Sequence, residues 1–177
     1  NPSRLLDVLS RFNQIRALLL DAHEEVPLDL QGAIDRVTPM LRALRHGDGG
    51  LALFNGGFEE DRTLIDTVLA GTGVRGKALT SAPHSGFQRL ASGRTVIIAD
   101  TGKPQLSDAR CAHAGTLSFE MSIGKNRLAV NCGAASTEGE RWFAAMRTTA
   151  AHSTLSTDDM DSIQFKDDGS PMGGPNN

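Results

Sequence analysis

The sequence predicts an α+β protein of 177 residues in which helices come first and antiparallel strands follow. In the first part of the chain, apolar side chains recur at steps of three and four, which is the period of a helix with one buried face. From about Ser85 the period changes to two and β-branched residues gather, as is typical of strands. Because the two kinds of segment do not alternate, we expect two structural units, residues 1–75 and 76–177, rather than an interleaved α/β sheet.

Three helices account for the first unit. The first begins near Ser3, a residue type that caps helix N-termini. The second continues to the glycine-rich turn at 46–50 and contains Pro39, which removes a backbone donor and should kink it. The third covers about 59–70, with Gly71 where a left-handed cap is expected. The apolar stripes of the first two helices are Leu5, Leu9, Phe12, Ile15 and Leu19, and Leu30, Ile34, Val37, Leu41 and Leu44.

Several strands are predicted in the second unit. Residues 94–99 (RTVIIA) are rich in β-branched side chains and end at a turn-like DTGKP. Residues 117–123 alternate apolar with polar side chains, as in a strand with one face in a core, and 127–132 form the return strand. Residues 148–157 and 162–165 are expected to add two more strands. Together these segments predict an antiparallel sheet.

The hairpin of residues 117–132 has a register that can be argued. A two-residue loop at 125–126 places every apolar side chain of both strands on one face, whereas a one-residue slip exposes the whole apolar set. We therefore predict that loop, with Asn131 opposite Glu120 on the polar face and Cys132 pointing into the core. The predicted pairs are Ile123 with Leu128, Met121 with Val130, and Phe119 with Cys132.

Composition and charge limit the possible functions. The net charge is −3, the pI is near 5.9 and the Lys and Arg residues are scattered, so we expect no nucleic-acid partner. No apolar run approaches the roughly 18 residues of a membrane span, and the first nine residues lack the features of a signal peptide. The chain begins at Asn1 without a methionine, so we expect a piece of a longer protein. Two cysteines are too few for a disulfide framework and are read as free thiols.

His113, Asn131 and His152 are the first candidates for a site. Two neutral imidazoles and an oxygen ligand suit zinc, whose open fourth position can hold water or substrate. Spacings of 18 and 21 residues are too long for a local motif, so only the strands could gather these side chains. The alternative is that each histidine is simply hydrogen-bonded within a β-core or at its edge.

A second group of candidates lies in RHGDGG at 45–50. His46 and Asp48 could serve as acid and base, or could help to bind a sugar carboxylate through Arg45. The alternative is a helix-ending turn in which Asp48 accepts from local backbone amides. Trp142 could stack on a sugar ring or belong to the core. No Ser/His/Asp arrangement and no glycine-rich phosphate cradle is evident. The chain contains no tyrosine, so a phenolic acid or base must come from outside it.

The blocks HAGTLSFEM, LAVNCG and RTTAAHSTL, in that order, resemble the heparinase II/III-like family of bacterial polysaccharide lyases. With the helices, the HGDGG junction and SGFQRLASGRTVIIAD, the resemblance covers nearly all of the chain. It implies that residues 1–75 are the last helices of an α/α toroid and that 76–177 begin an antiparallel β-sandwich, with the substrate cleft between them. It also implies a location in the periplasm or cell envelope.

The resemblance implies β-elimination on an acidic polysaccharide or oligosaccharide that contains uronate. The uronate carboxylate is neutralised, a base removes the proton at C5, and an acid protonates the leaving oxygen at C4. Position by position, His113 and His152 match zinc ligands, and Asn131 stands where the family has a metal-binding Asp. Cys111 stands in place of the family's catalytic sandwich histidine, where a thiolate would be the base.

The same comparison leaves a second hypothesis open. Cys111, Gly115 and Asn131 depart from the family pattern at positions that carry acid-base or metal-binding side chains. These departures favour a non-catalytic or divergent family member that binds carbohydrate or has a structural role in the cell envelope.

Overall fold

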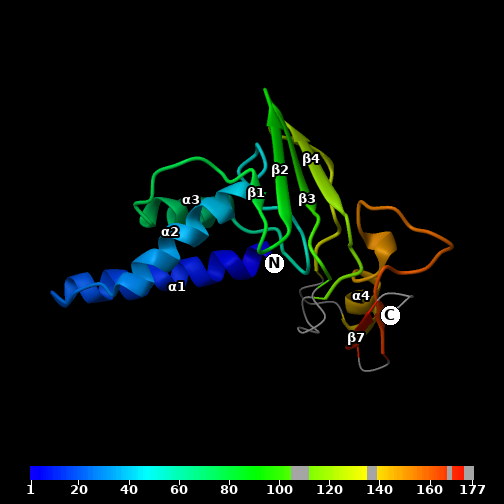
Figure 1. The fold of residues 1–177 in the computed structure, drawn as a ribbon, viewed down its shortest axis with the longest axis horizontal. Helices are drawn as coiled ribbons and strands as arrows, with labels where there is room; N and C mark the ends of the chain where they lie inside the picture. Colours follow the sequence, from blue (N-terminus) through cyan, green and yellow to red (C-terminus); the bar gives the residue numbers. More distant parts are fainter. Residues whose placement is uncertain (105–111, 135–138, 167–168, 174–177) are drawn as a thin grey trace.

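The computed structural model describes residues 1–104, 112–134, 139–166 and 169–173. Figure 1 shows an elongated molecule, with helices α1, α2 and α3 at one end, an antiparallel sheet in the middle, and α4 with strand β7 at the other end. The predicted α+β class is confirmed. The elements are α1 Pro2–Asp21, α2 Leu28–Ala43, α3 Arg62–Gly71, β1 Ser81–Ala82, β2 Phe87–Ser92, β3 Thr95–Asp100, β4 Phe119–Ile123, β5 Asn126–Ala129, α4 Gly139–Ala145, the 3-10 helix η1 Thr149–Ala151, β6 Gln164–Phe165 and β7 Pro171–Gly173.

The N-terminus of α1 is capped two residues earlier than predicted. The Asn1 side chain accepts a hydrogen bond from the Arg4 amide at 3.1 Å, which satisfies one of the free donors of the first turn. The Ser3 hydroxyl instead accepts from the Phe58 amide at 2.9 Å, a contact between the start of α1 and the segment before α3. The prediction that Ser3 caps the helix is therefore wrong, because its hydroxyl is used in a tertiary contact.

The end of α3 also differs from the prediction. Gly71 is the last helical residue, and the left-handed conformation belongs to Gly73 at φ +67°. The Thr72 hydroxyl donates to the Leu69 carbonyl at 2.9 Å and so satisfies one of the carbonyls that a helix end leaves unpaired. In α2, Pro39 lies inside the helix, and its carbonyl accepts from the Leu79 amide in the loop that follows α3.

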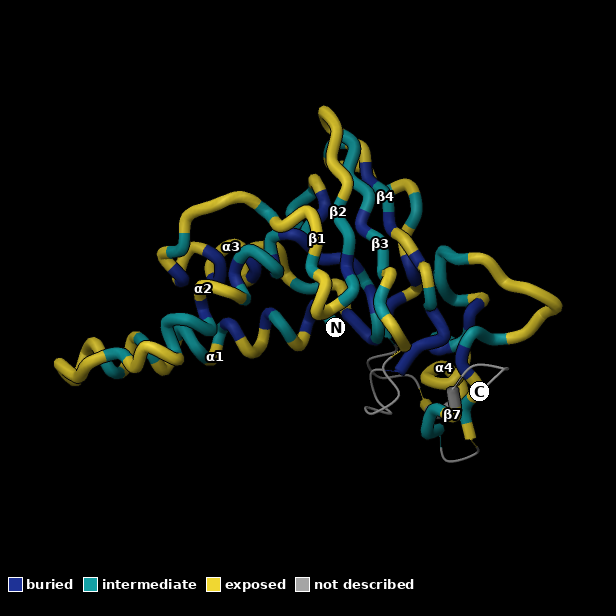
Figure 2. The backbone as a smooth tube through the Cα atoms, viewed as in Figure 1, coloured by how far each residue is buried: buried dark blue, intermediate teal, exposed yellow. Residues whose placement is uncertain are grey.

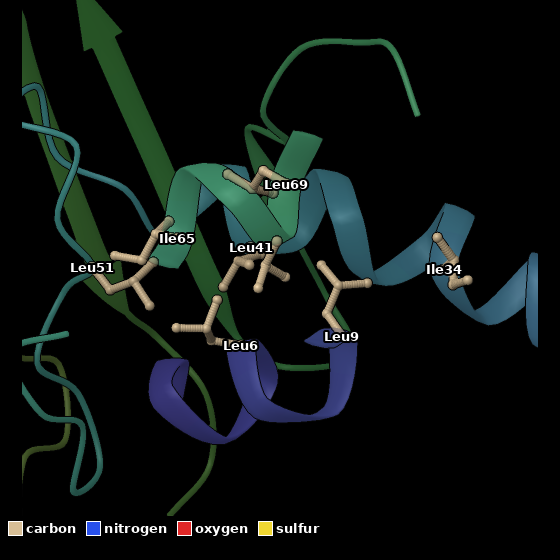
Figure 3. Close-up of a cluster of buried hydrophobic side chains, with 8 residues drawn as sticks. Leu6, Leu9, Ile34, Leu41, Leu51, Ile65 and Leu69 are labelled. Atoms are coloured by element: carbon tan, nitrogen blue, oxygen red, sulfur yellow. The ribbon is translucent and has the colours of Figure 1, made fainter. Parts of the chain in front are cut away.

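The three helices share one apolar core. Figure 3 labels members of this cluster on α1, α2, α3 and the segment after α2, with Ile34 at its outer end on α2. Burying one such leucine or isoleucine is worth about 1.5–3 kcal/mol, so this cluster holds the helical end together. The buried members are Leu6, Leu9, Ile34, Leu41, Leu51, Ile65, Val68 and Leu69.

A second apolar cluster joins the helices to the sheet. Phe54, in the segment after α2, packs on Phe87 of β2 with ring centroids 5.2 Å apart, and Ile98 of β3 lies in the same cluster. Beside it, the Arg89 guanidinium of β2 donates to the backbone carbonyls of Ala43 and Arg45, at 2.8 and 2.7 Å. One face of the sheet is thereby fixed against the end of α2.

The five strands are antiparallel and follow in chain order, β1-β2-β3-β4-β5, and β3 matches the predicted strand. The predicted hairpin register is wrong. The turn consists of Gly124 and Lys125, and Gly124 adopts φ +57°, a conformation that suits glycine. A bulge beside Met121 then pairs this residue with Ala129. The one-residue slip that the sequence argument rejected is thus present beyond the bulge.

The face of β4 that packs against the helices is the polar one. Ser118, Glu120 and Ser122 are buried, whereas Phe119 and Ile123 are 41% and 40% exposed. The alternation correctly predicted which side chains share a face, but the face assigned to the core was the wrong one. Buried donors from the helical part of the chain make the polar face the favourable one to bury, as described below for Glu120.

Residues 148–157 do not form the predicted strand. They contain η1, after which His152 returns to an extended backbone. The Thr149 amide donates to the Asp161 carboxylate at 2.6 Å, and the Thr149 hydroxyl donates to the Ala114 carbonyl at 2.8 Å, so hydrogen bonds that involve side chains take the place of strand pairing here.

The prediction that Cys132 points into the core is wrong, because its side chain is exposed. In the part of the chain that the structure describes, no helix is long and apolar enough to span a membrane.

Candidate functional site

Two histidines meet beside the sheet. His113 lies in the segment before β4, and His152 directly follows η1. Nδ1 of His113 is 3.2 Å from Nε2 of His152, and the planes of the two rings are at 84° to each other. His152 Nδ1 donates to the Thr148 carbonyl at 2.7 Å. A neutral imidazole has only one N–H, so His152 presents the lone pair of Nε2 to His113. The two predicted histidines therefore come together, although from loops and a 3-10 turn rather than from strands.

Both imidazoles are held neutral at pH 7. Burial lowers the pKa of His113 to about 3, and the charge of Arg147 and the charge that His152 carries when it is protonated act in the same direction. Burial also lowers the pKa of His152, although the Thr148 carbonyl and nearby carboxylates such as Asp161 oppose the shift. Neutral imidazoles can accept a proton or bind a cation, which are the two chemical uses of such a pair.

Gly115 forms one wall of this pair. A Cβ at this position would lie 2.6 Å from Cδ2 of His152, so the missing side chain makes room for the imidazole ring. The ring of His152 is held by the Thr148 carbonyl at its other side, so it has little freedom to give way.

We predict that Gly115→Ala displaces the His152 ring and lowers the free energy of unfolding by about 1–3 kcal/mol, the usual cost of overpacking. Imidazole ¹⁵N chemical shifts would report the broken contact with His113, and urea unfolding would report the stability. Gly32→Ala in α2 is a matched control, because its Cβ would contact only the flexible end of Arg36. Unchanged imidazole shifts in Gly115→Ala would contradict the packing described here.

Asn131 does contact Glu120, as expected, but the pair is buried. The Asn131 amide nitrogen donates to Glu120 Oε1 at 3.1 Å, and its Oδ1 accepts from the Ser153 amide at 2.9 Å. The side chain is thus engaged with groups other than the two imidazoles. No group of three His, Cys, Asp or Glu that could hold a metal is found among the described residues. Two imidazoles fall short of the three protein ligands of a catalytic zinc, so we route no chemistry through a metal.

Glu120 is the centre of a buried hydrogen-bond network. Its Oε2 is 2.8 Å from Nε2 of His46, and both side chains are fully buried. Its Oε1 accepts from the amides of Leu53 and Asn131, at 2.8 and 3.2 Å, and His46 Nδ1 is 3.0 Å from the Ser122 hydroxyl. The candidate acid-base residue His46 therefore has no surface for a substrate to reach, and it joins the end of α2 to β4.

The other candidates in the HGDGG turn are used within the protein. Asp48 accepts from the Gly50 amide and pairs with Arg127 of β5, each at 3.0 Å. Burial acts to raise the pKa of Asp48, but the hydrogen bond from Gly50 and the charge of Arg127 outweigh it and lower the pKa. Arg45 pairs with Asp66 of α3 at 2.7 Å. The turn is thus the helix-ending structure that the sequence allowed as an alternative.

The remaining two candidates lie elsewhere. Trp142 is on α4 and is 57% exposed, so its ring is accessible and is not part of a core. Cys111 lies outside the residues that the structure describes. Its chemical role stays a prediction.

A small polar pocket adjoins His113, and the sequence argument did not find most of it. Asn55, from the FNGG turn, and Lys103, from the turn after β3, line the pocket with Asp100 and His113. Asn55 has φ +52°, a strained conformation for a residue with a side chain, and its amide donates to the Asp100 carboxylate at 2.7 Å. Burial raises the pKa of Asp100. The consecutive glycines after Asn55 were the only sequence signal for this turn.

Helices packed on one end of an antiparallel sheet define the class of fold. Solved heparinase structures share it: the chain has a TM-score of 0.70 with the heparan sulfate lyase HepC from Pedobacter heparinus, at 19% identity over 92% of this chain and 30% of that one. A second heparinase III structure matches with a TM-score of 0.71, at 19% identity over 91% of this chain and 30% of that one. At this identity the likeness concerns the fold.

A sequence match settles the family. The sequence model of the family described as heparinase II/III-like, C-terminal, matches residues 74–173, so the chain belongs to this family. A curated relative, FtsZ-localized protein C from Caulobacter vibrioides, is 37% identical over 110 residues, which are 60% of this chain and 19% of that protein. The chain therefore spans less than a third of the proteins that it resembles.

Proposed function

We propose that this chain contributes one side of the cleft of a heparinase II/III-type lyase, which cleaves uronate-containing acidic polysaccharide by β-elimination. The observation that carries the proposal is the pocket beside His113, where the cation of Lys103, the amide of Asn55 and an imidazole face one small space. A cation and amide donors are what a uronate carboxylate requires. Family membership supports the same chemistry.

Two pocket residues, Lys103 and Asn55, have a proposed part in the reaction. Lys103 neutralises the uronate carboxylate, because the proton at C5 becomes acidic enough to remove only when that charge is compensated. Asn55 uses one amide proton on Asp100 and offers the other to the substrate. Cys111 is the proposed base, and the leaving-group acid comes from outside this chain. Trp142, whose ring is accessible, is proposed to contact sugar, whereas Arg45 is held by Asp66 and His46 positions β4 through Glu120.

The test is a lyase assay of the full-length protein on a panel of uronate polysaccharides, read from the ultraviolet absorbance of the unsaturated product. Lys103→Ala is expected to reduce the rate by about 10²–10³-fold, the usual cost of removing one charge-stabilising group. Lys125→Ala in the β4–β5 turn is a matched control that should retain full activity. Silence of the wild type on every polymer, or equal rates for the two variants, would count against the proposal.

A second candidate is a non-catalytic family member that binds carbohydrate or has a structural role in the envelope. It is favoured by the engagement of Asn131 with Glu120 and Ser153, and by the missing side chain at Gly115. The name of the Caulobacter relative also refers to localisation rather than to catalysis. Polysaccharide binding without product, unaffected by His113→Ala and His152→Ala, would support this candidate over the first.

We also propose a zinc site at the two histidines and a periplasmic or envelope location for the protein. Zinc would be held by His113 and His152, and Asn131 could be a third ligand only after its contacts with Glu120 and Ser153 are broken. Elemental analysis of the purified protein tests this directly. Stoichiometric zinc that is lost in His152→Ala would establish the site. A periplasmic or envelope location is tested by cell fractionation, since the name of the FtsZ-localized relative leaves the compartment open.

A further inference from the structure

The charges of this chain are unevenly distributed. Residues 67–99 contain no Asp or Glu but include four Arg or Lys residues, although the whole chain has a net charge of −3. The fold adds two cations to part of this region, since Arg36 and Arg42 come from α2 and the Arg42 guanidinium donates to the carbonyls of Val74 and Gly76. Two of the four cations, Arg75 and Lys77, lie in the loop between α3 and β1, beside which Arg42 of α2 is held. The other two, Arg89 and Arg94, lie on β2 and at the β2–β3 turn.

An apolar groove of about 320 Å³ lies in this basic region. One wall of the groove comes from α1 and α2, and the other comes from β1 and the residues on either side of it. The exposed loop between α3 and β1 leads into this second wall (Figure 2). The groove holds no acidic side chain among its lining residues. Its main lining residues are the apolar Leu5, Val37, Met40 and Leu79, with Arg36 and His84 as polar members.

The two walls of the groove are joined by one backbone hydrogen bond and one side-chain contact. The Leu79 amide donates to the Pro39 carbonyl, and the Ser85 hydroxyl is 3.8 Å from the sulfur of Met40, so the two walls are attached to each other. Arg36 lies over Gly32 one turn earlier in α2, where the absent side chain leaves room for the guanidinium. Within the described part of the chain, Arg36 is exposed and has no carboxylate partner.

We propose that this groove binds an acidic amphipathic peptide segment of a protein partner, with aliphatic side chains in the groove and carboxylates on Arg36 and the basic loop. A mainly aliphatic lining without Phe, Tyr or Trp suits leucine-like side chains better than a sugar, which stacks on the faces of those rings. Cations beside a hydrophobic groove give an acidic segment both its orientation and a faster association. The proposal does not depend on lyase activity.

The test is a selection of random peptides displayed on phage against the full-length protein, followed by fluorescence polarisation with the selected peptides. Enriched peptides are expected to combine Leu or Ile with Asp or Glu, and Arg36→Glu is expected to weaken their binding at least about tenfold by placing like charges together. Lys125→Glu makes the same charge change at the β4–β5 turn and should leave binding unchanged.

Two results would overturn the proposal. One is a selection without acidic-aliphatic enrichment, or with peptides whose affinity does not change in Arg36→Glu. The other is binding to phosphatidylglycerol vesicles that Arg36→Glu abolishes while no peptide is selected, which would assign the surface to an anionic membrane. Circular dichroism of Arg36→Glu confirms that the exposed substitution leaves the fold intact.

Discussion

Glu120→Ala is expected to lower the free energy of unfolding by about 3–5 kcal/mol, because several buried donors lose their acceptor and each unsatisfied buried donor costs about 1–3 kcal/mol. The carboxylate of Glu120 accepts from Nε2 of His46, from the Leu53 amide and from the backbone and side-chain amides of Asn131. All of these donors would be left unpaired in a region that water does not reach. Urea unfolding followed by circular dichroism measures the loss.

Two further variants show whether the network causes this loss. Glu120→Gln keeps the volume and one acceptor oxygen but places an amide beside the other donors, so its loss should be smaller than that of alanine. Glu24→Ala, at an exposed carboxylate after α1, should change stability by less than about 0.5 kcal/mol. A loss below about 1 kcal/mol for Glu120→Ala would show that the buried network contributes little to the junction.

Glu120 also shows where sequence reasoning stops. Alternation along β4 correctly groups Ser118, Glu120 and Ser122 on one face, because the side-chain period of a strand is two. It cannot tell which face is packed, and a charged residue is ordinarily assigned to solvent. The partner that makes burial of Glu120 favourable is His46, 74 residues earlier in the chain. Only the three-dimensional packing of the helical part on the sheet brings the two together.

The candidate site, like the buried face of β4, could be predicted from the sequence only in part. His113 and His152 could be selected because their residue types suit a site, and the structure does bring them together. The pocket residues Asn55 and Lys103 could not be selected, because their positions depend on turn conformations that no periodicity encodes. Asn55 is placed by its positive φ, and Lys103 follows the turn after β3. Turns set by tertiary contacts therefore limit site prediction more than helices or strands do.

Acidification is expected to destabilise the protein through His113. Its pKa is lowered to about 3 in the folded protein by burial, compared with 6.5 for an ordinary histidine. The unfolded state therefore binds a proton first, so the stabilisation is fully present above pH 6.5 and is lost as the pH falls toward 3. The loss is about 1.4 kcal/mol for each pH unit, and about 4–5 kcal/mol in total. The lowered pKa of His152 acts in the same direction.

Urea unfolding between pH 6.5 and about 5.5, above the range where most carboxylates titrate, isolates this effect. His113→Gln removes the titration, so its stability should depend less steeply on pH than that of the wild type. His84→Gln removes an exposed imidazole and should follow the wild-type curve. Asp100 has a raised pKa, so its contribution is present at low pH and is lost as the pH rises, which partly offsets the histidine effect in all three proteins. Parallel curves for His113→Gln and the wild type would therefore rule out His113 as the source of the acid sensitivity.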